Sequence, residues 1–233
     1  GRATSLALAG AGAQVGVHYN SSEREAQQTL ADLTQAGGRG CLLQGDLSDE
    51  TQANRVVDQL IEQLGRLDIL VNNAGISQRH PPEEYPLSEW HLLMEVHLHS
   101  SFDLAQQAAK TMLQRGRGKI INIGSVMSYE GGLNIPAYAA AKHALAGLTK
   151  SLANSWGKRG INVNCICPGY FETSMSHVLQ DDSVRGPQIL DRIPVGRWGQ
   201  PDEIAGLCVF LASDASNYMH GSTVAIDGGW LSR

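Results

Sequence analysis

The chain has 233 residues, of which 42% are hydrophobic and 18% charged, as is typical of one large globular α/β domain. Its formal net charge of −5 at pH 7, with no basic run, gives no electrostatic footprint for nucleic acid. No apolar stretch reaches the roughly 20 residues that a membrane span requires, and we expect no secretory signal. We therefore expect neither a nucleic-acid nor a membrane partner.

Helical and strand patterns alternate along the whole chain. A final turn follows at the sequence DGG. Helices are predicted over 4–11, 22–35, 50–64, 86–114, 137–158 and 202–212, and strands over 14–19, 40–44, 67–72, 119–124, 161–167 and 223–226.

Buried strands that alternate with helices predict parallel βαβ units in a doubly wound, Rossmann-type α/β sheet flanked by helices. In such a sheet the carboxyl ends of the strands share one edge, where ligands bind. Because no repeat, linker or composition break is visible, we expect one domain over 1–233. The polar segment 171–200, which Pro and Gly interrupt, is expected to close over a substrate as a lid.

The four cysteines indicate neither a zinc site nor a disulfide framework, because they form no CxxC pair and no cluster with histidine. Two of them alternate within the predicted strand 161–167, where small hydrophobic residues are common. A reducing, cytoplasmic compartment is the simplest expectation, and no metal is expected. The cysteines are Cys41, Cys165, Cys167 and Cys208.

Tyr138 and Lys142 lie one helical turn apart, and Ser125 lies thirteen residues upstream of Tyr138, after a predicted strand. Residues at i and i+4 share a helix face, with Cβ atoms about 5–6 Å apart. A phenol beside an ammonium group can titrate below its usual pKa of about 10, which suits proton exchange with a ketone or alcohol. Alone, the sequence YAAAK would equally suit an ordinary helix.

Four motifs in this order resemble the short-chain dehydrogenase/reductase family over essentially the whole chain. The resemblance implies an NAD(P)-dependent oxidoreductase, usually a homotetramer, with Tyr138 as general acid/base. Ser125 would bind and polarise the substrate oxygen, and Lys142 would hold the nicotinamide ribose and acidify Tyr138. The motifs are NNAG at 72–75, Ser125 with YAAAK at 138–142, PG at 168–169 with Thr173, and DGG at 227–229.

The same resemblance implies where the cofactor binds. Asp46 would meet the adenine, Asn73 the adenosine side, and Thr173 with the PG motif the nicotinamide carboxamide. The cofactor-binding candidates are Gly1, Tyr19, Asn20, Ser21, Asp46, Leu47, Asn73, Ala74, Gly75, Tyr138, Lys142, Pro168, Gly169, Phe171 and Thr173.

The chain departs from the family pattern at its start. Family members have a first strand and a glycine-rich loop ahead of the first helix, and here only Gly1 can be the last glycine of that loop. The loop cradles pyrophosphate with backbone amides at a helix N-terminus. Either the sequence is part of a longer chain, which we expect because the catalytic residues are intact, or this form binds dinucleotide poorly.

A second departure is His97, which stands where the family usually has Asn within a VNL motif. In relatives that Asn supports a helix distortion whose freed carbonyl anchors a water beside the lysine, in a proton relay. His97 could bond similarly, titrate and add pH sensitivity, degrade the relay, or merely fill space. We keep it as a catalytic candidate and expect His97→Asn to raise turnover without changing cofactor affinity.

The predicted strand 14–19 corresponds to the second strand of the family, and its end determines the choice between NAD and NADP. An acidic residue there binds the ribose diol of NAD. Here this end reads HYNSS over 18–22, with no carboxylate to repel a 2′-phosphate. Tyr19, Asn20 and Ser21 therefore favour NADP(H) over NAD(H).

Only some segments of the sequence indicate a substrate class. The segments 119–132, 189–199 and 227–233 resemble 2-deoxy-gluconate and gluconate 5-dehydrogenases, whereas the N-terminal half resembles 3-oxoacyl reductases equally well. A sugar acid needs a cation for its carboxylate, and Arg185, Arg192 and Arg197 are candidates, unless they form surface or subunit pairs. The alternatives are a 3-oxoacyl-type carbonyl reductase, a non-redox isomerase or dehydratase on this fold, and a non-catalytic binding protein.

Overall fold

The computed structural model describes residues 1–233 as a parallel α/β fold in three layers, with strands between two groups of helices. Every strand pairing is parallel, as the sequence predicts. The strands are β1 (Gln14–Tyr19), β2 (Arg39–Gln44), β3 (Ile69–Asn72), β4 (Gly118–Ile123), β5 (Ile161–Pro168) and β6 (Thr223–Ile226).

The strands form two sheets, β1–β2 and β3–β4–β5–β6. The facing edges of β1 and β3 pair with no strand, and side chains of both, including Val15, Val17, Ile69 and Val71, line one cavity of about 1360 Å³. This interruption agrees with the expectation that the first strand of the family is missing from the sheet. The same cavity continues to the carboxyl ends of the strands.

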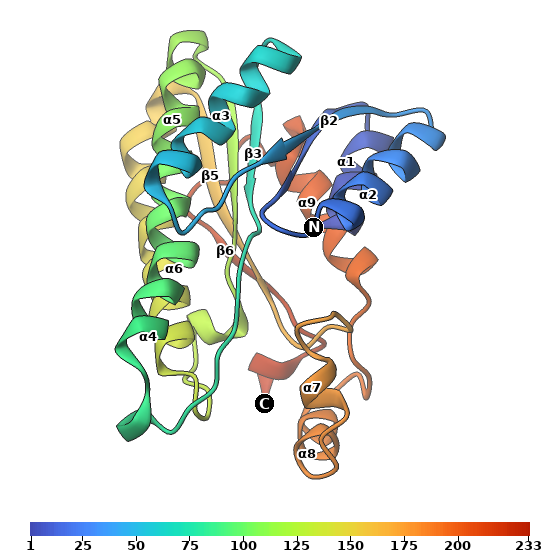
Figure 1. The fold of residues 1–233 in the computed structure, drawn as a ribbon, viewed down its shortest axis with the longest axis vertical. Helices are drawn as coiled ribbons and strands as arrows, with labels where there is room; N and C mark the ends of the chain where they lie inside the picture. Colours follow the sequence, from blue (N-terminus) through green and yellow to red (C-terminus); the bar gives the residue numbers. More distant parts are fainter.

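The helices cover both faces of the strands (Figure 1). One group, α3, α5 and α6, packs on one face, and α1, α2 and α9 pack on the other. None of the helices is both long enough and apolar enough to cross a membrane. The bounds are α1 (Arg2–Gly10), α2 (Glu23–Gln35), α3 (Glu50–Leu64), α4 (Leu87–Met94), α5 (Ser100–Arg115), α6 (Pro136–Trp156), α7 (His177–Gln180), α8 (Arg185–Arg192) and α9 (Pro201–Ala212).

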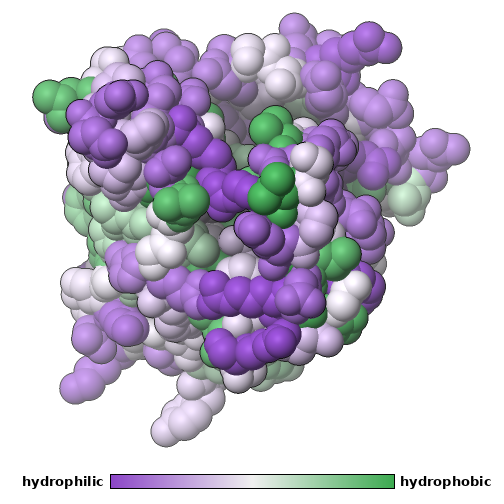
Figure 2. Space-filling model, turned by 90° about the horizontal axis from the view of Figure 1, so that it is seen from below, coloured by the Kyte–Doolittle hydropathy of each residue, from purple (hydrophilic) through white to green (hydrophobic).

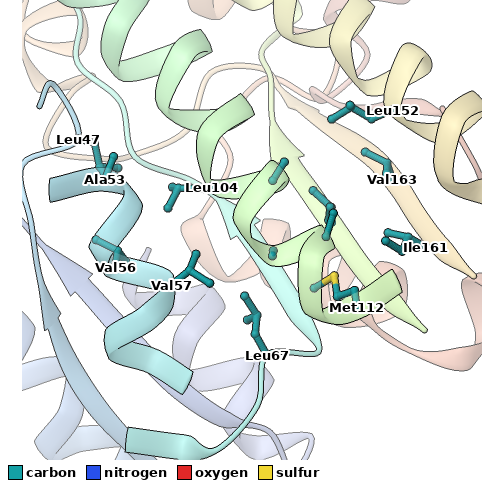
Figure 3. Close-up of a cluster of buried hydrophobic side chains, with 14 of the residues drawn as sticks. Leu47, Ala53, Val56, Val57, Leu67, Leu104, Met112, Leu152, Ile161 and Val163 are labelled. Carbon is teal, nitrogen blue, oxygen red and sulfur yellow. The ribbon is translucent and has the colours of Figure 1, made fainter. Parts of the chain in front are cut away.

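The largest group of buried side chains fills the space between α3, α5 and the sheet (Figure 3). Met112 of α5 and Ile161 and Val163 of β5 are fully buried there. The adjoining helix α3 begins where the Asp49 carboxylate accepts hydrogen bonds from the backbone N–H groups of Thr51 and Gln52. It ends at Gly65, whose φ of 82° favours glycine. This packing fixes where the strands end, and hence where the site lies.

Two segments differ from the simple predicted pattern. The helix predicted over 86–114 is continuous, but a π-helical turn at Glu95–His99 joins α4 to α5. The segment 171–200, predicted as a lid, contains the short helices α7 and α8, which lie below the strands with the C-terminus (Figure 1).

Candidate active site

The large cavity opens beyond the carboxyl ends of the strands. Figure 2 looks onto this end of the molecule, which is hollowed, with hydrophobic and hydrophilic side chains side by side around the hollow. Ser21 is exposed and lies outside the cavity lining. All other catalytic and cofactor-binding residues expected from the sequence line it: Gly1, Tyr19, Asn20, Asp46, Leu47, Asn73, Ala74, Gly75, His97, Ser125, Tyr138, Lys142, Pro168, Gly169, Phe171 and Thr173.

Ser125 is held at the end of β4 by the turn that follows it. Its Oγ accepts a hydrogen bond from the backbone N–H of Met127 at 3.1 Å. The Oγ of Ser128 accepts one from the backbone N–H of Ser125 at 3.3 Å and donates one to the carbonyl of Lys142 at 2.9 Å. These bonds fix the strand end against α6, so the Ser125 hydroxyl and the α6 side chains face the same cavity.

Lys142 lies one turn after Tyr138 on α6 and is 4% exposed. Its Nζ donates a hydrogen bond to the carbonyl of Ile123 at 2.6 Å and lies 5.6 Å from the centre of the Tyr138 ring. Burial lowers the pKa of Lys142 to about 8, because the protein interior disfavours the ammonium form. The side chain is therefore close to neutralisation at mildly alkaline pH.

The expectation that Tyr138 titrates below its usual pKa is wrong for this structure. Burial raises the pKa of the phenol, and a hydrogen bond with the Ser125 side chain and the charge of Arg79 only partly oppose this. The Lys142 ammonium is turned toward the Ile123 carbonyl. Tyr138 is consequently protonated at neutral pH, which suits it to donate a proton to a carbonyl oxygen.

His97 lies within the π-helical turn and is 1% exposed. Its Nε2 lies 2.7 Å from the carbonyl oxygen and 3.1 Å from the backbone nitrogen of Ile76, while its Nδ1 is buried without a partner. Burial, reinforced by the charge of Lys142, lowers the pKa of His97 to about 3. His97 is therefore neutral at physiological pH, which excludes the titrating role considered from the sequence.

Two serine hydroxyls bond to carbonyls of the π-helical turn, close to the candidate catalytic residues. The hydroxyls of Ser100 and Ser101 donate to the carbonyls of Val96 and His97, at 2.8 and 2.9 Å. Single π-turns inside α-helices are frequent at functional sites. The helix distortion that the family resemblance implies is thus present, with His97 in place of Asn.

A second, smaller cavity of about 260 Å³ adjoins the first and shares Met127 and Tyr170 with it. Tyr170 packs between two tryptophans, with ring centroids 5.3 Å from Trp198 and 4.6 Å from Trp230. Both tryptophans are buried, and Trp198 lies within the segment 171–200. No sequence pattern indicated Tyr170, although this residue directly follows the PG motif at a strand end.

The three arginines expected near the lid differ in their surroundings. Arg192 stacks on Trp230, 3.9 Å from the ring centre, and pairs with Glu130 at 2.8 Å. Arg197 pairs with Glu203 at 2.7 Å, outside both cavities. Arg185 forms no ion pair and lines the smaller cavity. The sequence reasoning missed Arg79, which follows β3 and lines the larger cavity, although its place after a strand end was a usable signal.

Comparison with known proteins decides the family. A family model described as enoyl-(acyl carrier protein) reductase matches residues 1–231. Over its whole length the chain is 48% identical to a 2-dehydro-3-deoxy-D-gluconate 5-dehydrogenase of Bacillus subtilis and covers 91% of that protein. The chain belongs to the short-chain dehydrogenase/reductase family. It is an oxidoreductase that transfers hydride between a nicotinamide cofactor and a secondary alcohol or ketone.

Solved structures of this family match the whole fold. One, from Beutenbergia cavernae, is assigned as an NAD(P)-dependent gluconate 5-dehydrogenase and holds NADP at low occupancy. It superposes with a TM-score of 0.96 at 40% identity, covering 100% of this chain and 92% of that one. A gluconate 5-dehydrogenase from Burkholderia cenocepacia in complex with NADP and tartrate gives a TM-score of 0.94 at 38% identity, covering 99% and 90%.

The lining of the large cavity fits the family's dinucleotide cofactor. At one end, the Asp46 carboxylate accepts hydrogen bonds from the backbone N–H and hydroxyl of Ser48, at 2.9 and 2.7 Å, and these bonds lower its pKa. Tyr19 ends β1 beside it, and no carboxylate follows before Glu23. At the other end Gly169 lies so close to Asp227 that a Cβ would meet its Cα at 2.8 Å. Only glycine therefore allows the chain at 169 to approach Asp227 this closely.

Proposed function

We propose that this chain is an NADP(H)-dependent dehydrogenase of a sugar acid. The observation that carries the proposal is the convergence of Ser125, Tyr138 and Lys142 on one cavity that also contains the end of β1. That strand end, read over 18–22, lacks the acidic residue that grips the ribose diol of NAD. Two facts about relatives support it: the Bacillus subtilis protein is named for a sugar acid, and the Burkholderia cenocepacia structure holds NADP and tartrate.

The residues divide the chemistry as follows. When bound, the nicotinamide supplies or accepts the hydride. Ser125 donates a hydrogen bond to the substrate oxygen, and the Tyr138 hydroxyl gives its proton to that oxygen in reduction or, as phenolate, takes it back in oxidation. Lys142 holds the nicotinamide ribose, and its charge favours the phenolate when it turns toward Tyr138.

The remaining candidates would hold the cofactor and cover the substrate. Tyr19, Asn20 and Ser21 take the adenosine ribose, Asp46 and Leu47 the adenine. The helices α7 and α8 act as a lid over the substrate. Gly1, Asn73, Ala74, Gly75, Pro168, Gly169, Phe171 and Thr173 hold the rest of the dinucleotide.

We further propose that the protein is cytoplasmic and assembles as a homotetramer. Each chain would contribute one catalytic domain over 1–233. All four cysteines are free thiols. Apolar side chains of α4 and α5 are exposed, including Leu87 at 72%, Leu92 at 40% and Phe102 at 38%, which suits a covered contact between copies. Sedimentation at micromolar concentration tests the assembly.

The experiment for the activity is a substrate panel with NADPH and NADH. We expect turnover of keto-gluconates with NADPH, and a loss of about a hundredfold to ten-thousandfold in Tyr138→Phe with NADPH binding unchanged. A 3-oxoacyl reductase is the second candidate, because the matching family model is described for acyl carrier protein substrates. Turnover of acyl ketones but not of keto-gluconates would replace the first proposal with the second.

A further inference from the structure

We propose that Glu130 is a positioning residue that joins the lid to the turn holding Ser125. The inference rests on the proposed function in one respect, because α7 and α8 are the proposed lid, but it does not depend on which carbonyl substrate is reduced. The Glu130 carboxylate bridges three segments that lie far apart in the sequence. These are the turn after β4, the end of α8 and the C-terminal turn after β6.

Glu130 is anchored on the turn that fixes Ser125. The carbonyl of Val126 accepts hydrogen bonds from the backbone N–H groups of Tyr129 and Glu130, at 2.9 and 3.1 Å. Within the same turn, the backbone N–H of Met127 donates to the Ser125 Oγ at 3.1 Å. A force on Glu130 therefore acts on the turn that holds the Ser125 hydroxyl.

The Glu130 carboxylate has one partner on each of its two oxygens. Its Oε1 accepts a hydrogen bond from the Nη2 of Arg192, the last residue of α8, at 2.8 Å. Its Oε2 accepts one from the Nε1 of Trp230, also at 2.8 Å. Because a guanidinium group and an indole N–H are donors only, the side chain between them needs two acceptor oxygens. A carboxylate has both, whereas the amide of Gln has one.

Arg192 and Trp230 also contact each other, which closes the network of Glu130, Arg192 and Trp230. The guanidinium carbon lies 3.9 Å from the centre of the Trp230 ring, and Trp230 is 4% exposed. A cation over an aromatic ring is held more strongly where water is excluded. The Asp227 carboxylate fixes the turn that carries Trp230, because it accepts the backbone N–H groups of Gly229 and Leu231, both at 2.9 Å.

The network forms one wall of the smaller cavity, beside the catalytic cavity. Glu130, Arg192 and Trp230 all line the smaller cavity, and Trp230 packs on Tyr170, which lines both cavities. With the network intact, the end of α8 is tied to the turn after β4. Without it, α8 is free to move away while the catalytic residues on β4 and α6 keep their places. We therefore expect the network to act on substrate binding more than on the chemical step.

The first test separates KM from kcat. Glu130→Gln keeps the length of the side chain and one acceptor oxygen but loses the ion pair, and Trp230→Phe removes only the N–H donor from the aromatic ring system. With NADPH and a keto-gluconate we expect each variant to raise KM about fivefold to twentyfold and to change kcat less than about twofold. NADPH affinity stays unchanged. If the substrate panel finds acyl ketones in place of keto-gluconates, the same variants are assayed with an acyl ketone.

The second test needs no substrate. Hydrogen exchange followed by mass spectrometry reports the opening of α8, and we expect its amides to exchange about tenfold faster in Glu130→Gln than in the wild type. The amides of α9 should exchange at the same rate in both. Arg197→Gln is the matched control, because it removes another Arg–Glu pair of the segment 171–200, at 2.7 Å, that lies outside both cavities.

Unchanged exchange of α8 in Glu130→Gln overturns the inference, and so does an equally fast exchange or an equal rise of KM in Arg197→Gln. A loss that falls on kcat with KM unchanged also overturns it, because the network would then act on the catalytic residues and not on the lid. If α8 opens in Glu130→Gln but neither keto-gluconates nor acyl ketones are turned over by the wild type, the proposed function fails while the role of Glu130 stands.

Discussion

His97 stands edge-to-face against Tyr138, with ring centroids 5.2 Å apart and ring planes at 88°. The imidazole thus contacts the Tyr138 phenol on one side and the backbone of Ile76 on the other. Because Ile76 directly follows the NNAG motif, His97 links the loop after β3 to Tyr138, the proposed proton donor. A neutral ring is required for this, since an imidazolium would face the Lys142 ammonium.

The low pKa of His97 predicts acid sensitivity. Its pKa is about 3 in the folded chain against 6.5 in the unfolded chain, so the unfolded state binds more protons between these values. Stability contributed by the neutral ring is complete above pH 6.5 and is lost as the pH falls toward 3. We expect urea unfolding to show about 2 kcal/mol more loss between pH 7.5 and pH 5 in the wild type than in His97→Asn. Equal losses would contradict the low pKa.

His97→Asn is also expected to raise turnover, by up to about tenfold, or ~1.4 kcal/mol of barrier. The structure leaves the Nδ1 of His97 buried without a partner, whereas a carboxamide offers both a donor and an acceptor in this place. Steady-state kinetics with a separate NADPH fluorescence titration checks this. Unchanged turnover, or a changed cofactor affinity, would show that His97 serves another purpose.

The helices and strands could be predicted well from the sequence, because local hydrophobic patterns and turn residues define each of them. The strands β1 and β6 and the helix α3 have the predicted bounds. The pKa of Tyr138 could not be predicted, because it depends on how burial outweighs nearby charge. Arg79 and Arg185 likewise left no joint mark: they are 106 residues apart, and only the fold brings both beside Leu133.

The buried ammonium group of Lys142 is expected to lower stability while it supports activity. Its pKa of about 8, against 10.5 unfolded, means that burying the ammonium costs folding energy at pH 7. We expect Lys142→Met to raise the free energy of unfolding at pH 7 by about 1–3 kcal/mol and to lower turnover at least about a hundredfold. Between pH 8 and 10.5 the unfolded state binds more protons than the folded state, so the wild type gains stability as the pH rises. The difference in free energy of unfolding between Lys142→Met and the wild type should therefore be smaller at pH 9.5 than at pH 7. A destabilised variant at pH 7 would show that the bond to Ile123 dominates.

A substitution at Tyr19 is expected to change the preference between NADP(H) and NAD(H). Tyr19 ends β1 and faces the large cavity, at the place where a carboxylate would meet a ribose. In Tyr19→Asp the added charge repels a 2′-phosphate and accepts hydrogen bonds from a ribose diol. We expect the ratio of kcat/KM for NADP(H) over NAD(H) to fall by about a hundredfold or more. Tyr218→Asp, which adds the same charge at a fully exposed side chain outside both cavities, is the control, and a shift as large there would show that the position of the added charge does not matter.

Gly75 predicts a coupling with His97 across the active site. A Cβ on Gly75 would lie 2.5 Å from the Cε1 of His97, so Gly75→Ala forces the ring away from Tyr138 and Ile76. The cost depends on the imidazole, because the shorter Asn side chain leaves room for a methyl group. In a double-mutant cycle we expect Gly75→Ala to lower turnover and stability strongly in the wild type and less in His97→Asn, with a coupling of about 1–2 kcal/mol. Additive effects would mean that the loop carrying Gly75 moves while the His97 ring keeps its place. His97 would then not be needed to position Tyr138.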